Sequence, residues 1–194
     1  KENVKVTDGL DFDYASHVAK FITIRLILFW PNCGNRKISI PDVITAFLQT
    51  TPYPPGAPPK YVWFICPISG KREYFCQRTP LYGEKCAPKR WEDTLAPEFE
   101  ELGFERGENE PSGYYHEEMD MSVLSFVDDL LEDGEDDALD WFESEETGIR
   151  QRFGCKPSTR IKPGMKVDYL GMDMSMDEQY LYLSMEGYID NLIT

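Results

Sequence analysis

Residues 123–131 read Val-Leu-Ser-Phe-Val-Asp-Asp-Leu-Leu, which places two adjacent carboxylates inside an otherwise apolar run. A buried anion costs several kcal/mol unless it is neutralised, and two neighbouring anions also repel each other. We therefore expect Asp128 and Asp129 at the tight bend of a β-hairpin, with their carboxylates projecting into a cleft. A divalent cation would make this pair tolerable, and Mg²⁺ prefers one or two carboxylates plus substrate phosphates. A solvated turn is the alternative that the pair alone leaves open.

The composition indicates one globular domain with a core of its own. Of 194 residues, 41% are hydrophobic and 13% are aromatic, which excludes a disordered chain. The apolar run at residues 21–30 is about half as long as a membrane span and contains Arg25. Five cysteines, at positions 33, 66, 76, 86 and 155, lack paired metal-ligand spacing, and we interpret them as reduced thiols of an intracellular protein. The first residues have no signal-peptide layout, and the missing initiator Met suggests a piece of a longer polypeptide.

The charge is strongly acidic but unevenly distributed. The net charge of −15 argues against a simple nucleic-acid binder, which usually has a basic face. Residues 92–146 contain 22 acids and one arginine, whereas residues 60–90 contain seven basic residues and two acids. Residues 150–166 contain six basic residues and no acid. Two local basic stretches therefore flank an acidic middle, and they could still hold a polyanion.

The pattern in the first half predicts a helix, a strand and a hairpin. A helix is expected from Ser16, as N-cap, to Trp30, followed by a stop at residues 31–35. A strand through Ile38 and Ile40 then leads past Asp42 into residues 46–48. Residues 51–60 contain five prolines and are expected to form an extended loop. Residues 61–65 and 73–77 read as a hairpin.

The second half predicts two helices and two further hairpins. The expected helices run from Trp91 to Leu102, with a kink at Pro97 and Gly103 after the end, and from Asp136 to Phe153. Strands are expected at 112–116 and around the Asp-Asp bend, and a hairpin is expected between 165–174 and 179–184. Residues 132–137 read as a solvated acidic loop, and 188–193 as a short amphipathic tail. This order predicts an α+β domain, with helices on one face of an antiparallel sheet.

Several collinear strings carry a family resemblance. They are Ser-His-Val-Ala-Lys at 16–20, Thr-Ile-Arg-Leu at 23–26, Asp-Val-Ile-Thr-Ala-Phe-Leu at 42–48, Leu-Tyr-Gly-Glu-Lys-Cys-Ala-Pro-Lys-Arg-Trp at 81–91, Leu-Gly-Phe at 102–104, Phe-Val-Asp-Asp at 126–129, Tyr-Leu-Gly-Met at 169–172, Leu-Ser at 183–184 and Tyr-Ile at 188–189. The chain resembles the reverse transcriptase domain of the Pol polyprotein of copia-type LTR retrotransposons over nearly its whole length. The string at 81–91 is the most specific.

The resemblance implies a right-hand polymerase palm, that is, a ferredoxin-like antiparallel sheet with helices packed on one face and with incomplete fingers and thumb. Residues 1–194 would be a partial domain. Within it, 1–36 and 50–80 would be fingers-side elements, 37–49 and 81–174 the palm, and 175–194 the palm end and the start of the thumb. The activity implied is RNA-directed DNA polymerisation, in which a primer 3′-hydroxyl attacks the α-phosphate of a dNTP with two Mg²⁺ ions (Mn²⁺ can substitute) as cofactors.

The resemblance also assigns site residues. Asp42, Asp128 and Asp129 would be catalytic, and Asp42, Asp128 and Val43 would hold the metal. Phe47, Tyr82, Gly83 and Lys156 would bind the nucleotide, and Leu170 and Gly171 would position the primer. From pattern alone, Asp42 reads as a helix N-cap or a strand-end charge, Gly83 as a turn glycine and Lys156 as a solvated charge. Phe47 reads equally well as core.

Departures from the family pattern leave other functions open. Phe126 stands where the family has Tyr, Glu84 stands where it has an apolar residue, and the chain begins after the basic fingers hairpin. The isolated fragment is therefore expected to be weak or inactive. A decayed or domesticated remnant that acts only as a binding module is the alternative, and a nucleotide cyclase on a similar palm is a third reading. The expected partners are a template with primer, dNTPs and the RNase H and integrase segments of Pol, without a membrane. The expected location is intracellular, either cytoplasmic (in a virus-like particle) or nuclear.

Overall fold

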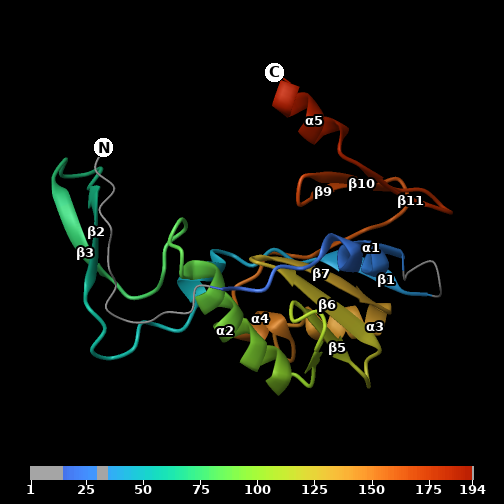
Figure 1. Cartoon of the computed structure of the whole chain (residues 1–194), viewed down its shortest axis with the longest axis horizontal. Coiled ribbons are helices and arrows are strands. Elements are labelled where there is room, and N and C mark those ends of the chain that lie inside the picture. The colour runs from blue at the N-terminus through green and yellow to red at the C-terminus, as the bar shows by residue number, and fades with distance from the viewer. Residues whose placement is uncertain (1–14, 30–34, 194) are drawn as a thin grey trace.

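The computed structural model of the chain describes residues 15–29 and 35–193, which form a mixed α+β fold (Figure 1). The largest sheet has six strands in the order β4-β5-β6-β7-β1-β8, all antiparallel to their neighbours. Its strands are β1 (Lys37–Ile40), β4 (Glu105–Arg106), β5 (Gly113–His116), β6 (Met121–Phe126), β7 (Asp129–Gly134) and β8 (Thr159–Arg160).

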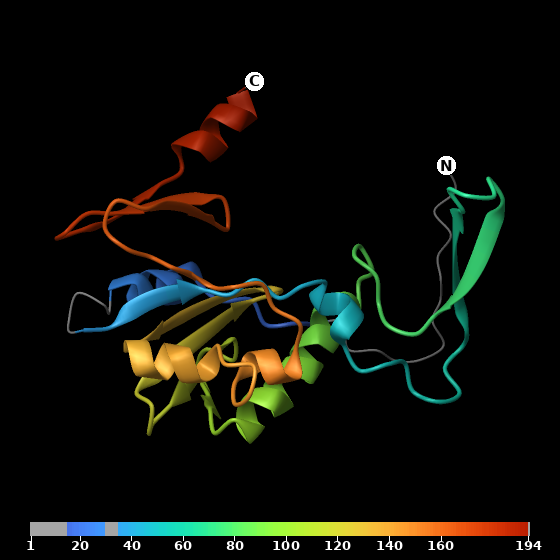
Figure 2. The ribbon, with the colours of Figure 1, turned by 180° about the vertical axis from the view of Figure 1, so that it is seen from behind.

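Two smaller sheets lie outside this main sheet. The first is a hairpin of β2 (Lys60–Ile65) and β3 (Arg72–Gln77), which projects away from the body of the molecule (Figures 1 and 2). The second has the order β11-β10-β9, formed by β9 (Lys166–Tyr169), β10 (Met172–Met176) and β11 (Leu181–Ser184). Helix α5 (Glu186–Ile193) follows it.

Helices cover both faces of the main sheet. Helices α2 (Ala87–Glu101), α3 (Asp136–Phe142) and α4 (Ile149–Arg152) lie on one face, and α1 (Phe21–Phe29) lies on the other, beside β9–β11 (Figures 1 and 2). Val123 and Leu130 pack into a core with the buried side chains of α2, α3 and α4. Their neighbours Leu124 and Leu131 pack into a second core, with those of α1, β9 and β10. This is the alternation that a strand imposes. The expectation that helices pack on one face only is therefore wrong for α1.

The predicted hairpin at residues 123–131 is confirmed. Strands β6 and β7 pair from Ser122–Asp133 to Phe126–Asp129, which leaves Val127 and Asp128 as the turn. The apolar run lacks alternation in sequence because β6 and β7 lie inside the sheet, where both faces are buried. The β2–β3 hairpin, the extended loop before it and the α2 helix ending before Gly103 also agree with the sequence predictions.

The first helix begins later than predicted. Residues 15–20 are not helical and α1 starts at Phe21, while Trp30 and residues 31–34 of the predicted stop lie outside the described residues. The backbone N–H of His17 donates to a Glu92 carboxylate oxygen at 2.8 Å, and that of Lys20 donates to Glu110 at 3.2 Å. These donors are engaged by other segments, so Ser16 does not cap a helix.

The predicted helix from Asp136 to Phe153 is wrong as one element, because α3 and α4 are separated by residues 143–148. A Cβ added at Gly148 would lie 1.8 Å from the Phe142 carbonyl oxygen, so the chain folds back too tightly there for any other residue. The inward positions predicted for this region, Leu139, Phe142, Ile149 and Phe153, are all buried in the core.

The C-terminal hairpin is a three-stranded sheet instead. The segment predicted as one strand at 165–174 turns at Leu170–Gly171, so that β9 pairs with β10 and β10 pairs with β11. Leu170 and Gly171 have φ values of 54° and 76°. This left-handed pair makes a two-residue hairpin loop, for which glycine is favoured.

The acidic run at 132–137 is not the solvated loop that was predicted. Glu132 and Asp133 lie in β7 with 0% and 1% exposure. Arg36 compensates Asp133, because its Nη2 lies 2.7 Å from Asp133 Oδ2. Neither carboxyl oxygen of Glu132 has a hydrogen-bond partner within the described residues, and burial, together with the nearby Glu143 carboxylate, raises the pKa of Glu132 well above its ordinary value. Burial therefore favours the neutral, protonated form of this acid.

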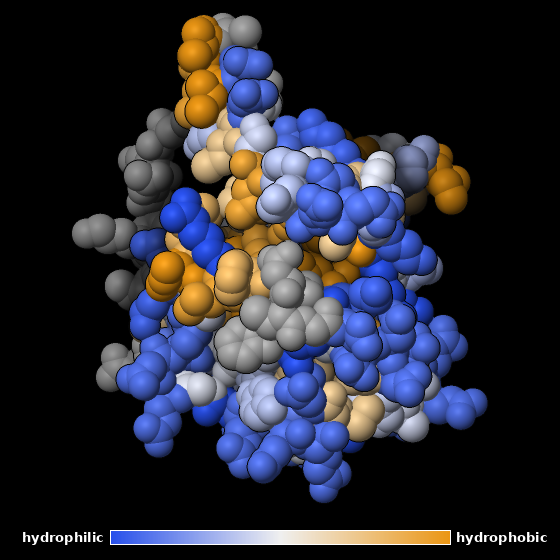
Figure 3. All heavy atoms as spheres, turned by 90° about the vertical axis from the view of Figure 1, so that its right-hand side faces the viewer, coloured by the Kyte–Doolittle hydropathy of each residue, from blue (hydrophilic) through white to orange (hydrophobic). Residues whose placement is uncertain are grey.

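Polar and apolar surfaces are segregated on the side facing away from the hairpin. In Figure 3 the lower part of this side is largely hydrophilic, and hydrophobic side chains gather at the top on α5, where Ile189, Leu192 and Ile193 are exposed. Within residues 15–29 and 35–193, no helix is long and apolar enough to cross a membrane. Cys66, Cys76, Cys86 and Cys155 carry free thiols, and Cys33 lies outside the described residues.

The neutral Glu132 carboxyl predicts an inverted pH dependence of stability. Above the pKa of an unfolded glutamate, about 4.3, the unfolded chain loses a proton that the folded chain keeps, so stability falls as the pH rises toward the folded pKa. Glu132→Gln should remove this loss and gain about 1.4 kcal/mol on the wild type for each pH unit in that window. Urea unfolding at pH 4, 6 and 8 measures it, with exposed Glu118→Gln as the control. A Glu132→Gln curve parallel to the wild type would contradict the prediction.

Candidate active site

The turn between β6 and β7 holds Asp128 in a strained backbone. Val127 has a φ of 59°, and a β-branched residue in this left-handed region costs about 1–3 kcal/mol. The Trp91 indole N–H of α2 donates to the Val127 carbonyl at 2.7 Å, and the Ser125 hydroxyl donates to it at 3.2 Å. The turn is therefore fastened to α2, which fixes the position of Asp128.

Asp42 is brought to the same turn by the pairing of β1 with β7. An isolated bridge joins Asp42 to Asp129 and continues the register of the β1–β7 ladder, in which Ser39 pairs with Glu132. The ladder is interrupted before it because Pro41 has no N–H to donate. Directly opposed residues of an antiparallel pair project to the same face. Asp42 and Asp129 therefore share one face of the sheet. Asp128 lies in the adjacent turn, one position before Asp129.

The electrostatics of Asp129 show how close the acids are. Burial raises its pKa, and the negative charges of Asp128, Asp42 and Asp168 raise it further. Asp168 lies on β9 and was not identified from the sequence, where no motif or spacing marks it. The structure therefore gathers four acids from three separate segments near the end of β7.

Lys156 neutralises part of this charge. Its Nζ lies 2.6 Å from Asp42 Oδ2, and its backbone N–H donates to the Asp42 carbonyl at 2.9 Å. The two side chains are 61% and 54% exposed, so the ion pair contributes little to stability. Lys156 is therefore an exposed charge, as its pattern predicted, with Asp42 as its partner. Its role toward a nucleotide, which the resemblance implied, stays a prediction.

Tyr82 covers Phe47 and reaches Asp128. The two rings lie 4.6 Å apart between centroids, and the Tyr82 hydroxyl donates to Asp128 Oδ2 at 3.5 Å. Phe47, in the short helix η2 (Ala46–Gln49), is buried, whereas Tyr82 is 55% exposed. Gly83 has a φ of 93° and nothing within 4 Å of an added Cβ. Glycine is therefore required there for its conformation, with open space beside it.

Val43 can offer only its backbone, because a valine side chain has no donor atom. It pairs with Cys155 in an isolated bridge flanked by the bonds from Ile44 N to Gly154 O and from Lys156 N to Asp42 O. In an antiparallel ladder such a residue directs its own carbonyl away from this partner segment. The Val43 carbonyl therefore accepts no hydrogen bond from residues 154–156. Burial raises the pKa of the Cys155 thiol beside it to about 11, which makes this cysteine unreactive.

The remaining site predictions are only partly placed. Leu170 and Gly171 form the β9–β10 turn, and Asp168 on β9 lies near enough to Asp129 to affect its pKa. Their role toward a primer stays a prediction. In the part of the chain that the structure describes, no three His, Cys, Asp or Glu side chains are grouped closely enough to hold a metal ion.

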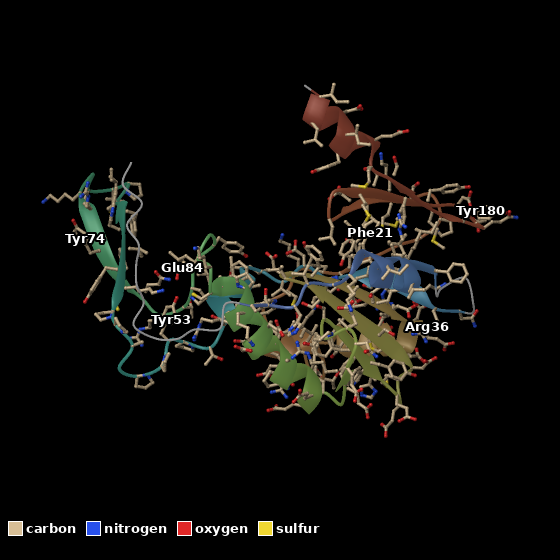
Figure 4. All side chains as sticks on the ribbon, viewed as in Figure 1. Phe21, Arg36, Tyr53, Tyr74, Glu84 and Tyr180 are labelled. Atoms are coloured by element: carbon tan, nitrogen blue, oxygen red, sulfur yellow. The ribbon has the colours of Figure 1, made fainter. Side chains whose placement is uncertain are left out.

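Glu84 anchors the β2–β3 hairpin to the site loop. Its carboxylate accepts hydrogen bonds from the Tyr53 hydroxyl and Lys60 Nζ, both at 3.0 Å, and from the Gln77 amide. Burial acts to raise the pKa of Glu84, but these donors outweigh it and the pKa is lowered. Tyr53 and Glu84 lie together at the base of the hairpin, while Tyr74 lies far out on it (Figure 4). The departure from the family pattern at Glu84 therefore has a local structural role.

The indole bond to the turn predicts a specific cost for Trp91→Phe. The ring remains, but the Val127 carbonyl loses its best donor, so the free energy of unfolding should fall by roughly 1–3 kcal/mol. Chemical denaturation measures this. Trp141→Phe is the control, because the Trp141 indole makes no hydrogen bond within residues 15–29 and 35–193. Equal losses in both variants would mean that ring packing, not the hydrogen bond, supports the turn.

The Glu84 contacts predict a local effect for Glu84→Ala. Backbone amides of residues 60–77 should exchange roughly tenfold faster or more, because the base of the hairpin loses its common acceptor, while global unfolding changes little. Hydrogen exchange read by mass spectrometry measures both, with exposed Glu178→Ala as the control. Unchanged exchange in the hairpin would show that other contacts hold it.

Comparisons with known proteins identify no family for the chain. No family model and no curated protein matches it. Among solved structures, the apo telomerase of Candida tropicalis, truncated from its C-terminal domain, is similar at 14% sequence identity with a TM-score of 0.44. The match covers 84% of this chain and 38% of that one, so the chain spans less than half of the telomerase structure. A similarity of this size establishes no family membership, and the copia-type origin stays a prediction.

Proposed function

We propose that this chain is the palm part of an RNA-directed DNA polymerase of the copia type, which adds dNTPs to a primer on an RNA or DNA template. The observation that carries the proposal is the pairing of Asp42 with Asp129 beside the Asp128 turn. A polymerase needs carboxylates from two distant chain positions at one point. The strings at residues 42–48 and 126–129, which contain these acids, also carry the family resemblance, together with the string at 81–91.

The types of donor are those that Mg²⁺ prefers, but the described acids must approach one another more closely to hold an ion. Carboxylate oxygens of Asp42 and Asp128, with the Val43 carbonyl, would hold the ions, and substrate phosphates would complete their coordination. Besides burial, the negative charges of Asp128, Asp42 and Asp168 raise the pKa of Asp129, and a bound cation would reduce this repulsion. When bound, the ions would stabilise the attacking and leaving oxygens. Lys156 would exchange its contact with Asp42 for the phosphates of the dNTP, and Tyr82 would move off Phe47 so that this ring meets the sugar.

A specific observation also favours a second candidate, a remnant that binds but does not catalyse. The Lys156 ammonium already compensates Asp42, and the Tyr82 ring already covers Phe47. A site closed by its own residues needs neither metal nor nucleotide. Metal binding separates the candidates: Mn²⁺ with dTTP should raise the Tm of wild type but not of Asp42→Asn if the polymerase proposal holds.

Primer extension tests the activity. With a basic fingers segment joined to its N-terminus, the chain should extend oligo(dT) on poly(rA) with Mg²⁺ or Mn²⁺. Asp128→Asn should lower this rate roughly 100-fold or more, since it removes part of the charge that holds the ions. The control is Asp137→Asn, an exposed acid on α3. A folded protein without any extension would favour the remnant.

A further inference from the structure

One face of the β2–β3 hairpin carries a row of exposed aromatic side chains. Trp63 lies opposite Tyr74, and Tyr61 is two residues before Trp63 on the same strand, so all three project to one face. They are 53%, 64% and 65% exposed, respectively. Large aromatic rings gathered in the open on a two-stranded sheet indicate an interaction surface.

The opposite face keeps this row in place. Phe64 and Phe75 stack there with their centroids 4.9 Å apart and their planes within 10° of each other. The Glu84 contacts fasten the base of the hairpin through Lys60 and Gln77. The aromatic row therefore stands on a braced hairpin.

The charge of the hairpin identifies the kind of partner. Residues 60–78 contain four basic residues and one acid in a chain of net charge −15. The Arg72 guanidinium lies 4.1 Å over the Trp63 ring, so a planar cation and an indole are presented together. Aromatic rings beside positive charge are the means by which proteins stack the bases and hold the backbone of single strands.

A second exposed aromatic pair in the molecule shows the contrast. Tyr180 and Tyr182 are 60% and 50% exposed. Tyr180 lies at the end of the β10–β11 hairpin (Figure 4). Their neighbours are Asp177, which accepts a hydrogen bond from the Tyr182 hydroxyl at 2.7 Å, and Glu178. Exposure is equal on the two hairpins, but only the β2–β3 hairpin has a charge that attracts a polyanion.

We propose that Tyr61, Trp63 and Tyr74, with Arg72, bind single-stranded nucleic acid by base stacking. The inference deepens the proposed function, because it names a surface for unpaired template outside the carboxylate site. The inference rests on the proposed function only where it identifies the bound single strand as a template. Binding is measured without synthesis, so the two can fail separately.

The test is fluorescence anisotropy of a short labelled oligo(dT) with the full chain at low ionic strength. The double variant Trp63→Ala/Tyr74→Ala should bind roughly 5- to 100-fold more weakly, the effect of losing a stacked base. The matched control, Tyr180→Ala/Tyr182→Ala, should bind as the wild type does. Arg72→Glu should weaken binding and reduce its salt dependence. Thermal unfolding checks that each variant is folded.

Several outcomes would overturn the inference. These are no binding by the folded wild type, equal losses in both double variants, a duplex that competes as well as the single strand, or sedimentation showing that Trp63 and Tyr74 instead join two copies of the chain. Binding that depends on Trp63 and Tyr74 in a protein without primer extension would support the inference and count only against the polymerase proposal.

Discussion

The antiparallel pairing of β1 with β7 is the constraint on which the site depends. Its register sets Asp42 opposite Asp129, although 87 positions separate them in the chain. A slip of one residue would turn every side chain of β1 to the other face, removing Ile38 from its core cluster and Asp42 from its partner. The buried side chains of β1 and β7 therefore hold the carboxylates together at no separate cost, because the core selects the same register that the site needs.

Strand β7 and its turn carry four acids, and the surroundings of each are different. Asp133 has Arg36, Glu132 keeps a proton, and Asp129 stands among like charges that raise its pKa. Among the described residues, Asp128 in the strained turn accepts the long bond from Tyr82 alone. Asp133 and Glu132 are fully buried. Asp129, by contrast, lies near the like charges of Asp128, Asp42 and Asp168. Perturbed pKa values of this kind cluster at functional sites.

Local patterns predicted the hairpin at 123–131, the β2–β3 hairpin and α2, because turn residues and apolar spacing are enough to define each of them. The failures have long-range causes. The helix predicted from Ser16 starts late because carboxylates of Glu92 and Glu110 bind the backbone N–H groups of residues 17 and 20. The acids at 132–133 are buried, Asp133 with Arg36 as its partner and Glu132 with a raised pKa that favours its neutral form. The candidate site was predicted by resemblance to a family motif. Lys156 beside Asp42 and Asp168 near Asp129 depend on tertiary pairing that no local pattern reveals.

The uneven charge of the sequence acquires a spatial meaning at the site. An acidic site in a chain of net charge −15 repels a polyanion, so any nucleic acid must be attracted by other parts of the chain. Both basic stretches contribute a contact to the carboxylates: Tyr82, from residues 60–90, reaches Asp128, and Lys156, from residues 150–166, reaches Asp42. The first stretch also contains the aromatic hairpin, fastened through Glu84 to the loop that carries Tyr82. The basic segments thus border the acids, which is the arrangement that the proposed function requires.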